Sequence, residues 1–204
     1  MQAKKALIIF IRNPELGKVK TRLAATVGDE NALLIYEELL RYTMQITENL
    51  PVRKMLFYAD KIAENDCWPT TAFDKFLQQP GDLGMRMQAA FEKAYAEGAS
   101  QIMIIGSDCY ELSEALVNKA FTKLETHDAV IGPAADGGYY LLGFSRPNHS
   151  VFQNKNWSTD SVFQTTIQDL ERENFSYFVL PVLNDVDEEK DLGELRKLLL
   201  LKSN

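Results

Sequence analysis

Cysteine and histidine are scarce in this sequence, which holds two of each among its 204 residues. Two cysteines, Cys67 and Cys109, are too few for a cysteine-rich zinc site, and they argue against a disulfide framework. The histidines, His127 and His149, lie neither in a cluster with metal-ligand spacing nor beside a candidate nucleophile, so we interpret both as surface residues. Carboxylates and cationic side chains remain as the groups that could carry chemistry.

Long apolar runs and an excess of positive charge are also missing. No stretch approaches the roughly 18 uncharged residues of a membrane-spanning helix, and the apolar run near the N-terminus is broken by Arg12 without a small-residue cleavage site. The formal net charge of -7 argues against a general nucleic-acid or anionic membrane surface. We therefore expect a cytoplasmic protein with no nucleic-acid partner and no membrane span. The oligomeric state is left open.

Two glycine-rich nucleotide fingerprints do not occur either. The dinucleotide pattern G-x-G-x-x-G is absent, and the phosphate-loop pattern G-x-x-x-x-G-K-[ST] fails at Arg12 and at Val19. A nicotinamide-dependent oxidoreductase is disfavoured for this reason.

Strand-length apolar runs alternate with segments of helical period along the chain. The alternation predicts an α/β fold with a mostly parallel sheet, helices on both faces, and a single domain over residues 1–204. The expected strands are Ala6–Ile11, Met55–Ala59, Ile102–Ile105, Ala129–Ile131, Tyr139–Phe144 and Tyr177–Leu180.

Three details of this layout are more specific. The run Tyr139–Phe144 follows a turn sequence and could pair antiparallel at an edge of the sheet. Asp29 can cap the first long helix, and Ser113 can open another. The segment Asp191–Leu201 is predicted to be a C-terminal helix with its leucines at 192, 195, 198 and 199 facing inward.

A basic segment follows the first expected strand directly. Because ligands of open α/β sheets collect beyond the carboxyl ends of the strands, this position is informative. Gly17 favours an irregular loop, and a helix can begin at Arg22, so backbone N–H groups converge with Lys18 and Lys20 where a phosphate could bind. A solvated basic loop is the alternative interpretation.

Carboxylates follow two other expected strands. Asp108 comes directly after Ile102–Ile105, where Mg²⁺ bound through one or two carboxylates and phosphate oxygens could hold a nucleotide. Asp185 and Asp187 alternate on an extended segment and so point the same way, toward one cation or one set of donors. The alternatives are a turn or helix cap at Asp108 and an acidic helix N-terminus after Asp185.

Three glycine- or tryptophan-containing loops complete the candidates. The Asp136–Tyr140 segment offers a close backbone approach, hydrogen bonds and stacking faces for a sugar or base, although a hairpin turn explains it equally well. The Gly81–Arg86 segment leads into a helix, and Asn156–Asp160 contains a tryptophan and a helix cap. Either of these two loops could be structural.

Together these segments resemble a known family. Their order is FIRNPELGKVKTRL from Phe10, GDLGMRM from Gly81, IIGSDC from Ile104, GPAADGGYYLLGF from Gly132, WSTDSV from Trp157 and DVDEEKDL from Asp185. This order is similar to the bacterial glycosyltransferase-like proteins of the nucleotide-diphospho-sugar transferase superfamily. It also resembles 2-phospho-L-lactate guanylyltransferase and, more distantly, molybdenum cofactor guanylyltransferase. The resemblance extends from Ala6 to Leu199 and is more specific for the family than for a substrate.

The resemblance implies a GT-A fold, with a Rossmann-like sheet, and a role for each segment. It implies that the basic segment holds the phosphates, that the Gly81–Arg86 loop borders the base, and that Asp136–Tyr140 lines the sugar or acceptor side. Asp108 and Asp187 would bind Mg²⁺ or Mn²⁺, and Asp108 and Asp136 are the expected catalytic residues. The residues expected to contact the donor are Arg12, Gly17, Lys18, Lys20, Arg22, Gly81, Asp82, Gly84, Arg86, Ser107, Gly137, Gly138, Tyr139, Trp157 and Ser158.

The expected activity is a metal-dependent transfer that uses an activated nucleotide. The first hypothesis is glycosyl transfer from a nucleotide-sugar, and the alternatives are nucleotidyl transfer from a nucleoside triphosphate or nucleotide binding without turnover. The family pattern usually has proline at Tyr110, glutamate at Ala135 and lysine at Arg12. The missing carboxylate at Ala135 bears on acceptor activation and leaves nucleotide binding intact.

Overall fold

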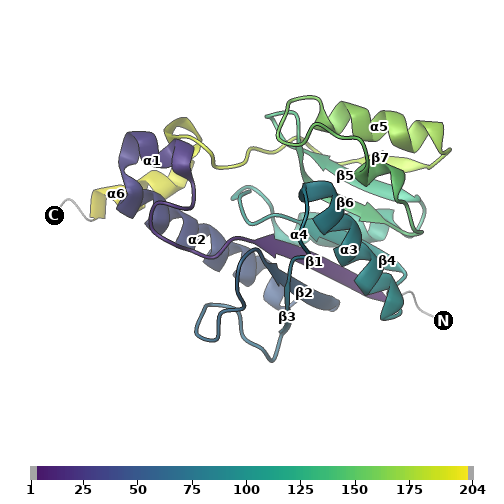
Figure 1. Cartoon of the computed structure of the whole chain (residues 1–204), viewed down its shortest axis with the longest axis horizontal. Helices are drawn as coiled ribbons and strands as arrows, with labels where there is room; N and C mark the ends of the chain where they lie inside the picture. The colour runs from purple at the N-terminus through teal and green to yellow at the C-terminus, as the bar shows by residue number, and fades with distance from the viewer. Residues whose placement is uncertain (1–3, 202–204) are drawn as a thin grey trace.

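Seven strands form one sheet in the computed structural model, which describes residues 4–201 (Figure 1). The strand order is β3-β2-β1-β4-β6-β5-β7, and every neighbouring pair is parallel except those that β6 makes with β4 and β5. The strands are β1 Lys5–Ile11, β2 Arg53–Tyr58, β3 Phe73–Leu77, β4 Gln101–Ile105, β5 Ala129–Pro133, β6 Tyr139–Phe144 and β7 Tyr177–Val179.

Helices connect these strands. The α-helices are α1 Thr21–Val27, α2 Asp29–Glu48, α3 Leu83–Ala96, α4 Glu114–Lys123, α5 Val162–Arg172 and α6 Arg196–Leu201, and short 3-10 turns cover Ser150–Phe152, Glu189–Asp191 and Gly193–Leu195. Two of the helices begin at side-chain caps, because Asp82 accepts a hydrogen bond from the Met85 N–H, and Ser113 accepts one from the Leu116 N–H.

The core consists of two layers, one on each face of the sheet. Along β1 the buried side chains alternate between these layers, as expected for a strand covered on both faces. Leu7 and Ile9 pack with residues of α2 and α4, whereas Ala6 and Ile8 pack with residues of α3 and α5. In Figure 1, α3 crosses in front of β4, and α1 and α6 lie beyond α2 at one end of the molecule.

The predicted α/β fold class is confirmed, and so are the six expected strands, with differences of one or two residues at their ends. The sequence pattern missed β3, which is a half-buried edge strand with Asp74 and Lys75 in its centre, so it lacks a continuous apolar run. That residues 1–204 form a single domain stays a prediction.

Three local predictions are wrong in detail. The strand Tyr139–Phe144 is antiparallel but lies between β4 and β5, because β5 and β7 extend the sheet beyond it. Asp29 lies within the first turn of α2 and Gly28, with φ 84°, takes the cap position. The segment Asp191–Leu201 is not one helix, because Gly193 at φ 46° lies in the 3-10 turns that precede α6.

No helix within residues 4–201 is both long enough and apolar enough to cross a bilayer.

Gly84 is a packing glycine in the first turn of α3. A Cβ atom there would lie 2.2 Å from the backbone oxygen of Phe152 and 2.7 Å from the Trp157 ring. Gly84→Ala should therefore lower the free energy of unfolding by about 2 kcal/mol or more, although Gly→Ala in a helix usually raises it by up to about 1 kcal/mol. Urea denaturation measures the change. Met85→Ala, at an exposed neighbouring position, should change it by less than about 0.5 kcal/mol. A Gly84→Ala variant as stable as the parent would contradict this packing.

Candidate active site at the carboxyl ends of the strands

A cleft of about 470 Å³ opens where the carboxyl ends of the parallel strands meet. Arg12 follows β1, Ala59 follows β2, and the segment Gly106–Cys109 follows β4, and all of them line it. Because β6 runs antiparallel, its amino end meets the carboxyl end of β4, so Tyr139 and Tyr140 line the cleft as well. This is the edge of the sheet at which ligands of open α/β folds bind.

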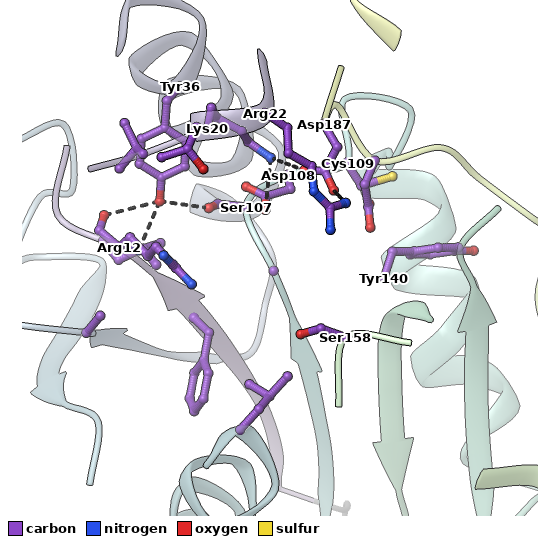
Figure 2. A pocket seen from close by; sticks show the side chains of 18 of the residues that line it. Arg12, Lys20, Arg22, Tyr36, Ser107, Asp108, Cys109, Tyr140, Ser158 and Asp187 are labelled. Carbon is purple, nitrogen blue, oxygen red and sulfur yellow. Dashed lines mark hydrogen bonds and ion pairs between the residues drawn. The ribbon is translucent and has the colours of Figure 1, made fainter. Parts of the chain in front are cut away.

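Lys20 lies between two carboxylates in the lining of the cleft (Figure 2). Its Nζ is 3.1 Å from Asp108 Oδ2 and 3.0 Å from Asp187 Oδ1. The Lys20 side chain is 5% exposed, whereas those of Asp108 and Asp187 are 45% and 42% exposed. Burial alone would lower the pKa of Lys20, but the two carboxylates outweigh it and raise that pKa. The lysine is therefore firmly cationic.

The backbone at Lys20 is unusual and fixes where its side chain points. Lys20 has φ 48° and ψ 45°, in the left-handed region that residues with a Cβ atom rarely adopt, and α1 begins at the next residue. Val19 and Leu23, on either side of it, are buried in the core. Packing of these neighbours holds the backbone in this conformation and turns the Lys20 side chain into the cleft.

Tyr36 joins the basic loop to the loop after β4. Its hydroxyl accepts a hydrogen bond from the Arg12 N–H at 2.9 Å and donates one to the Arg12 carbonyl at 3.1 Å, and it lies 3.5 Å from Ser107 Oγ. Burial, and then the charge of Asp108, raise the pKa of Tyr36, so the phenol stays neutral. The helical period of α2 indicated only a core residue at this position.

Asp185 adds a third carboxylate to the cleft, and it lines the cleft together with Asp187. The Val186 N–H between them donates to the Asp108 carbonyl at 2.9 Å, which ties this segment to the loop after β4. Burial, together with the charges of Asp108 and Asp136, raises the pKa of Asp185 to about 7. Asp185 is therefore only partly ionised near pH 7.

The cleft brings together nine of the seventeen donor-contact and metal residues expected from the sequence. Those that line it are Arg12, Lys20, Arg22, Arg86, Ser107, Asp108, Tyr139, Ser158 and Asp187. Gln78, which the sequence pattern did not single out, also lines it, because it follows the missed strand β3; its side-chain amide donates to the carbonyls of Ile11 and Phe57.

The structure puts the other expected residues outside the lining of this cleft. In the basic loop, Gly17 lies away from the lining and Lys18 is 74% exposed, with its Nζ 2.6 Å from Glu15. At α3, Asp82 caps the helix and Gly81 accepts a hydrogen bond from the Arg86 side chain. Gly84 packs against the Ser150–Phe152 turn. Gly81 and Asp82 thus use their polar groups in the first turn of α3 and do not line the cleft.

Four residues of the acceptor-side segments support the cleft without lining it: Asp136, Gly137, Gly138 and Trp157. Asp136 accepts a hydrogen bond from the Gly138 N–H and so stabilises the turn before β6. Gly137, at φ 90°, lies so close to the next loop that a Cβ atom would be 2.1 Å from the Asp160 carbonyl. This packing positions Ser158 and Tyr139 in the lining.

Asp108 and Asp187 are the residues best suited to hold a divalent cation. Mg²⁺ is commonly bound through one or two carboxylates together with water and phosphate oxygens, and both side chains are partly accessible from the cleft. Asp185 lines the cleft beside these two carboxylates, and a cation would reduce the repulsion among the three. Within residues 4–201, no three His, Cys, Asp or Glu side chains are already grouped as a metal site.

The chain is similar to known proteins along its length. The family model described as "Uncharacterized protein conserved in bacteria (DUF2064)" matches residues 42–159. The crystal structure described as a "putative nucleotide-diphospho-sugar transferase" from Desulfovibrio desulfuricans G20 is 33% identical, with a TM-score of 0.88 over 97% of this chain and 88% of its own. No curated protein sequence matches significantly. The first two similarities confirm the family resemblance.

Two more distant structures share the fold. One is CMP:2-keto-3-deoxy-manno-octonic acid synthetase complexed with CTP, 10% identical, with a TM-score of 0.58 over 98% of this chain and 100% of its own. The other is Rv0371c from Mycobacterium tuberculosis H37Rv in complex with manganese, 14% identical, with a TM-score of 0.54 over 98% of this chain and 99% of its own. The chain thus has a fold that nucleotidyltransferases also use.

Tyr36→Phe should loosen the basic loop. The variant leaves the Arg12 N–H and carbonyl without their partner, so the free energy of unfolding should fall by about 1–2 kcal/mol. Amide hydrogen exchange at Arg12 should also become faster. Tyr42→Phe is the matched control, because it removes one hydrogen bond from the same helix, to the Leu112 carbonyl, away from the loop. Equal exchange rates at Arg12 in both variants would contradict the role of Tyr36.

Asp185→Asn should stabilise the protein more as the pH rises. An ordinary aspartate has a pKa of about 3.9. Between about pH 4 and pH 7 the unfolded chain has therefore lost the proton of Asp185, while the folded chain keeps it. Asp185 thus lowers the free energy of unfolding as the pH rises through this range. The variant should gain on the order of 2 kcal/mol at pH 8 and little at pH 4. Urea denaturation at several pH values, with a chelator present, measures this. A gain that does not grow with pH would refute it.

Proposed function

This chain belongs to the DUF2064 family of bacterial proteins, and we propose that it is a metal-dependent transferase whose donor is an activated nucleotide. The observation that carries the proposal is the convergence of Lys20 and three arginines with three carboxylates in one cleft. The 33% identical structure described as a "putative nucleotide-diphospho-sugar transferase" supports it.

The cations of the cleft are suited to a diphosphate. Arg12, Lys20, Arg22 and Arg86 all line it, although the formal net charge of the chain is -7. A phosphate chain would therefore be attracted locally and not by the field of the whole protein. Fixed cations also stabilise the negative charge that develops on a leaving phosphate, without any covalent nucleophile.

The carboxylates are suited to the cation that such a donor brings. We propose Asp108 and Asp187 as the residues that hold Mg²⁺ or Mn²⁺. When bound, the ion would neutralise charge on the phosphate oxygens of the donor. The manganese complex of Rv0371c supports the use of a divalent cation by a protein of this fold.

The opposite wall of the cleft is proposed for the sugar or acceptor. Tyr139 and Tyr140 offer aromatic faces and Ser158 offers a hydroxyl, and Figure 2 shows Tyr140 and Ser158 across the cleft from Arg12. Asp136, which is exposed in the turn before β6, is proposed as the carboxylate that assists the acceptor. Ala135 supplies no carboxylate beside it, so a single acid would have to serve.

We propose glycosyl transfer from a nucleotide-sugar as the first candidate reaction. Nucleotidyl transfer from a nucleoside triphosphate is the second, and the specific observation in its favour is the shared fold with a synthetase complexed with CTP. The two reactions differ in which bond breaks: the bond between the sugar and the diphosphate, or the bond between the α- and β-phosphates.

Asp108→Asn should abolish metal-dependent stabilisation by the donor. A panel of nucleoside triphosphates and nucleotide-sugars, with and without Mg²⁺ or Mn²⁺, should raise the melting temperature of the parent, because a ligand at 100 times its Kd adds about 2.7 kcal/mol. The variant should show less than a tenth of the parent affinity. Release of pyrophosphate would identify nucleotidyl transfer, and release of a nucleoside diphosphate would identify glycosyl transfer. Equal donor affinity in Asp108→Asn would reject the assignment of Asp108.

A further inference from the structure

The two carboxylates proposed to hold the divalent cation already hold another cation, the ammonium of Lys20. The Lys20 Nζ is 3.1 Å from Asp108 and 3.0 Å from Asp187, and no other cationic side chain among residues 4–201 forms an ion pair with both. Arg22 is the next nearest at 3.8 Å from Asp187, and its side chain is 72% exposed. Lys20 therefore occupies the position between the carboxylates.

Lys20, Asp108 and Asp187 form an ion triad that the fold holds in place, and Lys20 is not a mobile surface lysine. The Lys20 side chain is almost fully buried although it lines a cleft, and its backbone is held in the left-handed region. Three segments far apart in sequence meet there: the basic loop, the loop after β4 and the segment before Glu189. A long, flexible side chain loses conformational freedom on such burial, so strong contacts must offset the cost.

A divalent cation and the Lys20 ammonium cannot share this position at low cost. Two like charges a few ångströms apart repel strongly in a partly buried site, where screening by water is weak. Lys20 must therefore move when the cation binds to Asp108 and Asp187. The phosphates of a nucleotide donor would give its ammonium a new anionic partner in the same cleft.

We propose that Lys20 is an internal counter-ion: its ammonium occupies the position of the divalent cation between Asp108 and Asp187, and it leaves that position only when the phosphates of the donor bind. The inference rests on the proposed function for the identity of the donor. Lys20 then makes the cation bind weakly by itself and tightly together with the nucleotide, which is positive coupling between two ligands through one side chain. Before the donor binds, Lys20 holds the two carboxylates in position for the cation. After the donor binds, Lys20 contacts phosphate.

The test is the affinity of the protein for Mn²⁺ alone, measured from the electron paramagnetic resonance signal of the free ion. Lys20→Met keeps the length of the side chain and removes its charge, so Mn²⁺ should bind at least about tenfold more tightly than to the parent. A merely structural role of Lys20 would predict weaker binding. Lys18→Met is the matched control, because Lys18 pairs with Glu15 outside the cleft, and it should leave Mn²⁺ affinity unchanged.

A second variant allows the test to be made even if Lys20→Met does not fold. Lys20→Asn also removes the charge, and asparagine adopts the left-handed backbone region more readily than most residues. It should show the same tightening of Mn²⁺ binding. Unchanged or weaker binding of Mn²⁺ in whichever variant has the circular dichroism spectrum of the parent would overturn the inference.

The nucleotide panel separates this inference from the proposed function. If Mn²⁺ binds more tightly to Lys20→Met and nucleotides stabilise the parent only with Mn²⁺ present, both are supported. If nucleotides stabilise the parent with Mn²⁺ but the Lys20 variants do not bind Mn²⁺ more tightly, the inference is wrong and the function stands. If no nucleotide stabilises the parent while the variants bind Mn²⁺ more tightly, the proposed donor is wrong and only the counter-ion role of Lys20 remains.

Discussion

The ion triad of Lys20, Asp108 and Asp187 is the interaction on which the organisation of the cleft depends. It joins the loop after β1, the loop after β4 and the segment that follows β7, and these segments share no regular secondary structure. Backbone and side-chain hydrogen bonds support it from both sides, through Val186 to Asp108 and through Tyr36 to Arg12. Three loops that would otherwise be solvated separately thereby form one surface.

The direction of the strands explains why this surface lies at one edge of the sheet. Parallel strands present their carboxyl ends on the same side, and the antiparallel strand β6 presents its amino end there. The loops after β1 and β4 bring cations and carboxylates to that edge, and β6 brings two tyrosines. The donor side and the acceptor side of the proposed reaction are therefore separated by the topology of the sheet and meet across the cleft.

Charge is distributed unevenly over the molecule, which fits an enzyme that selects a small anion together with its cation. An acidic protein repels polyanions at long range, and the arginines of the cleft can still bind a phosphate chain at short range. The three carboxylates beside those arginines are the property that distinguishes this cleft from a simple anion site.

The sequence by itself determined the fold class, six of the strands and the loops that line the cleft, because hydrophobic period and strand-end position are local properties of the chain. It could not show that β6 is an interior strand, nor that Gly84 packs against Phe152 and Trp157, because both depend on neighbours distant in sequence. Only the tertiary structure decided that, of the neighbouring cations Lys18 and Lys20, the first is exposed and the second is buried between two carboxylates. The physical reason is that the left-handed backbone at Lys20 and the packing around it set the direction of one side chain, and no local pattern encodes that direction.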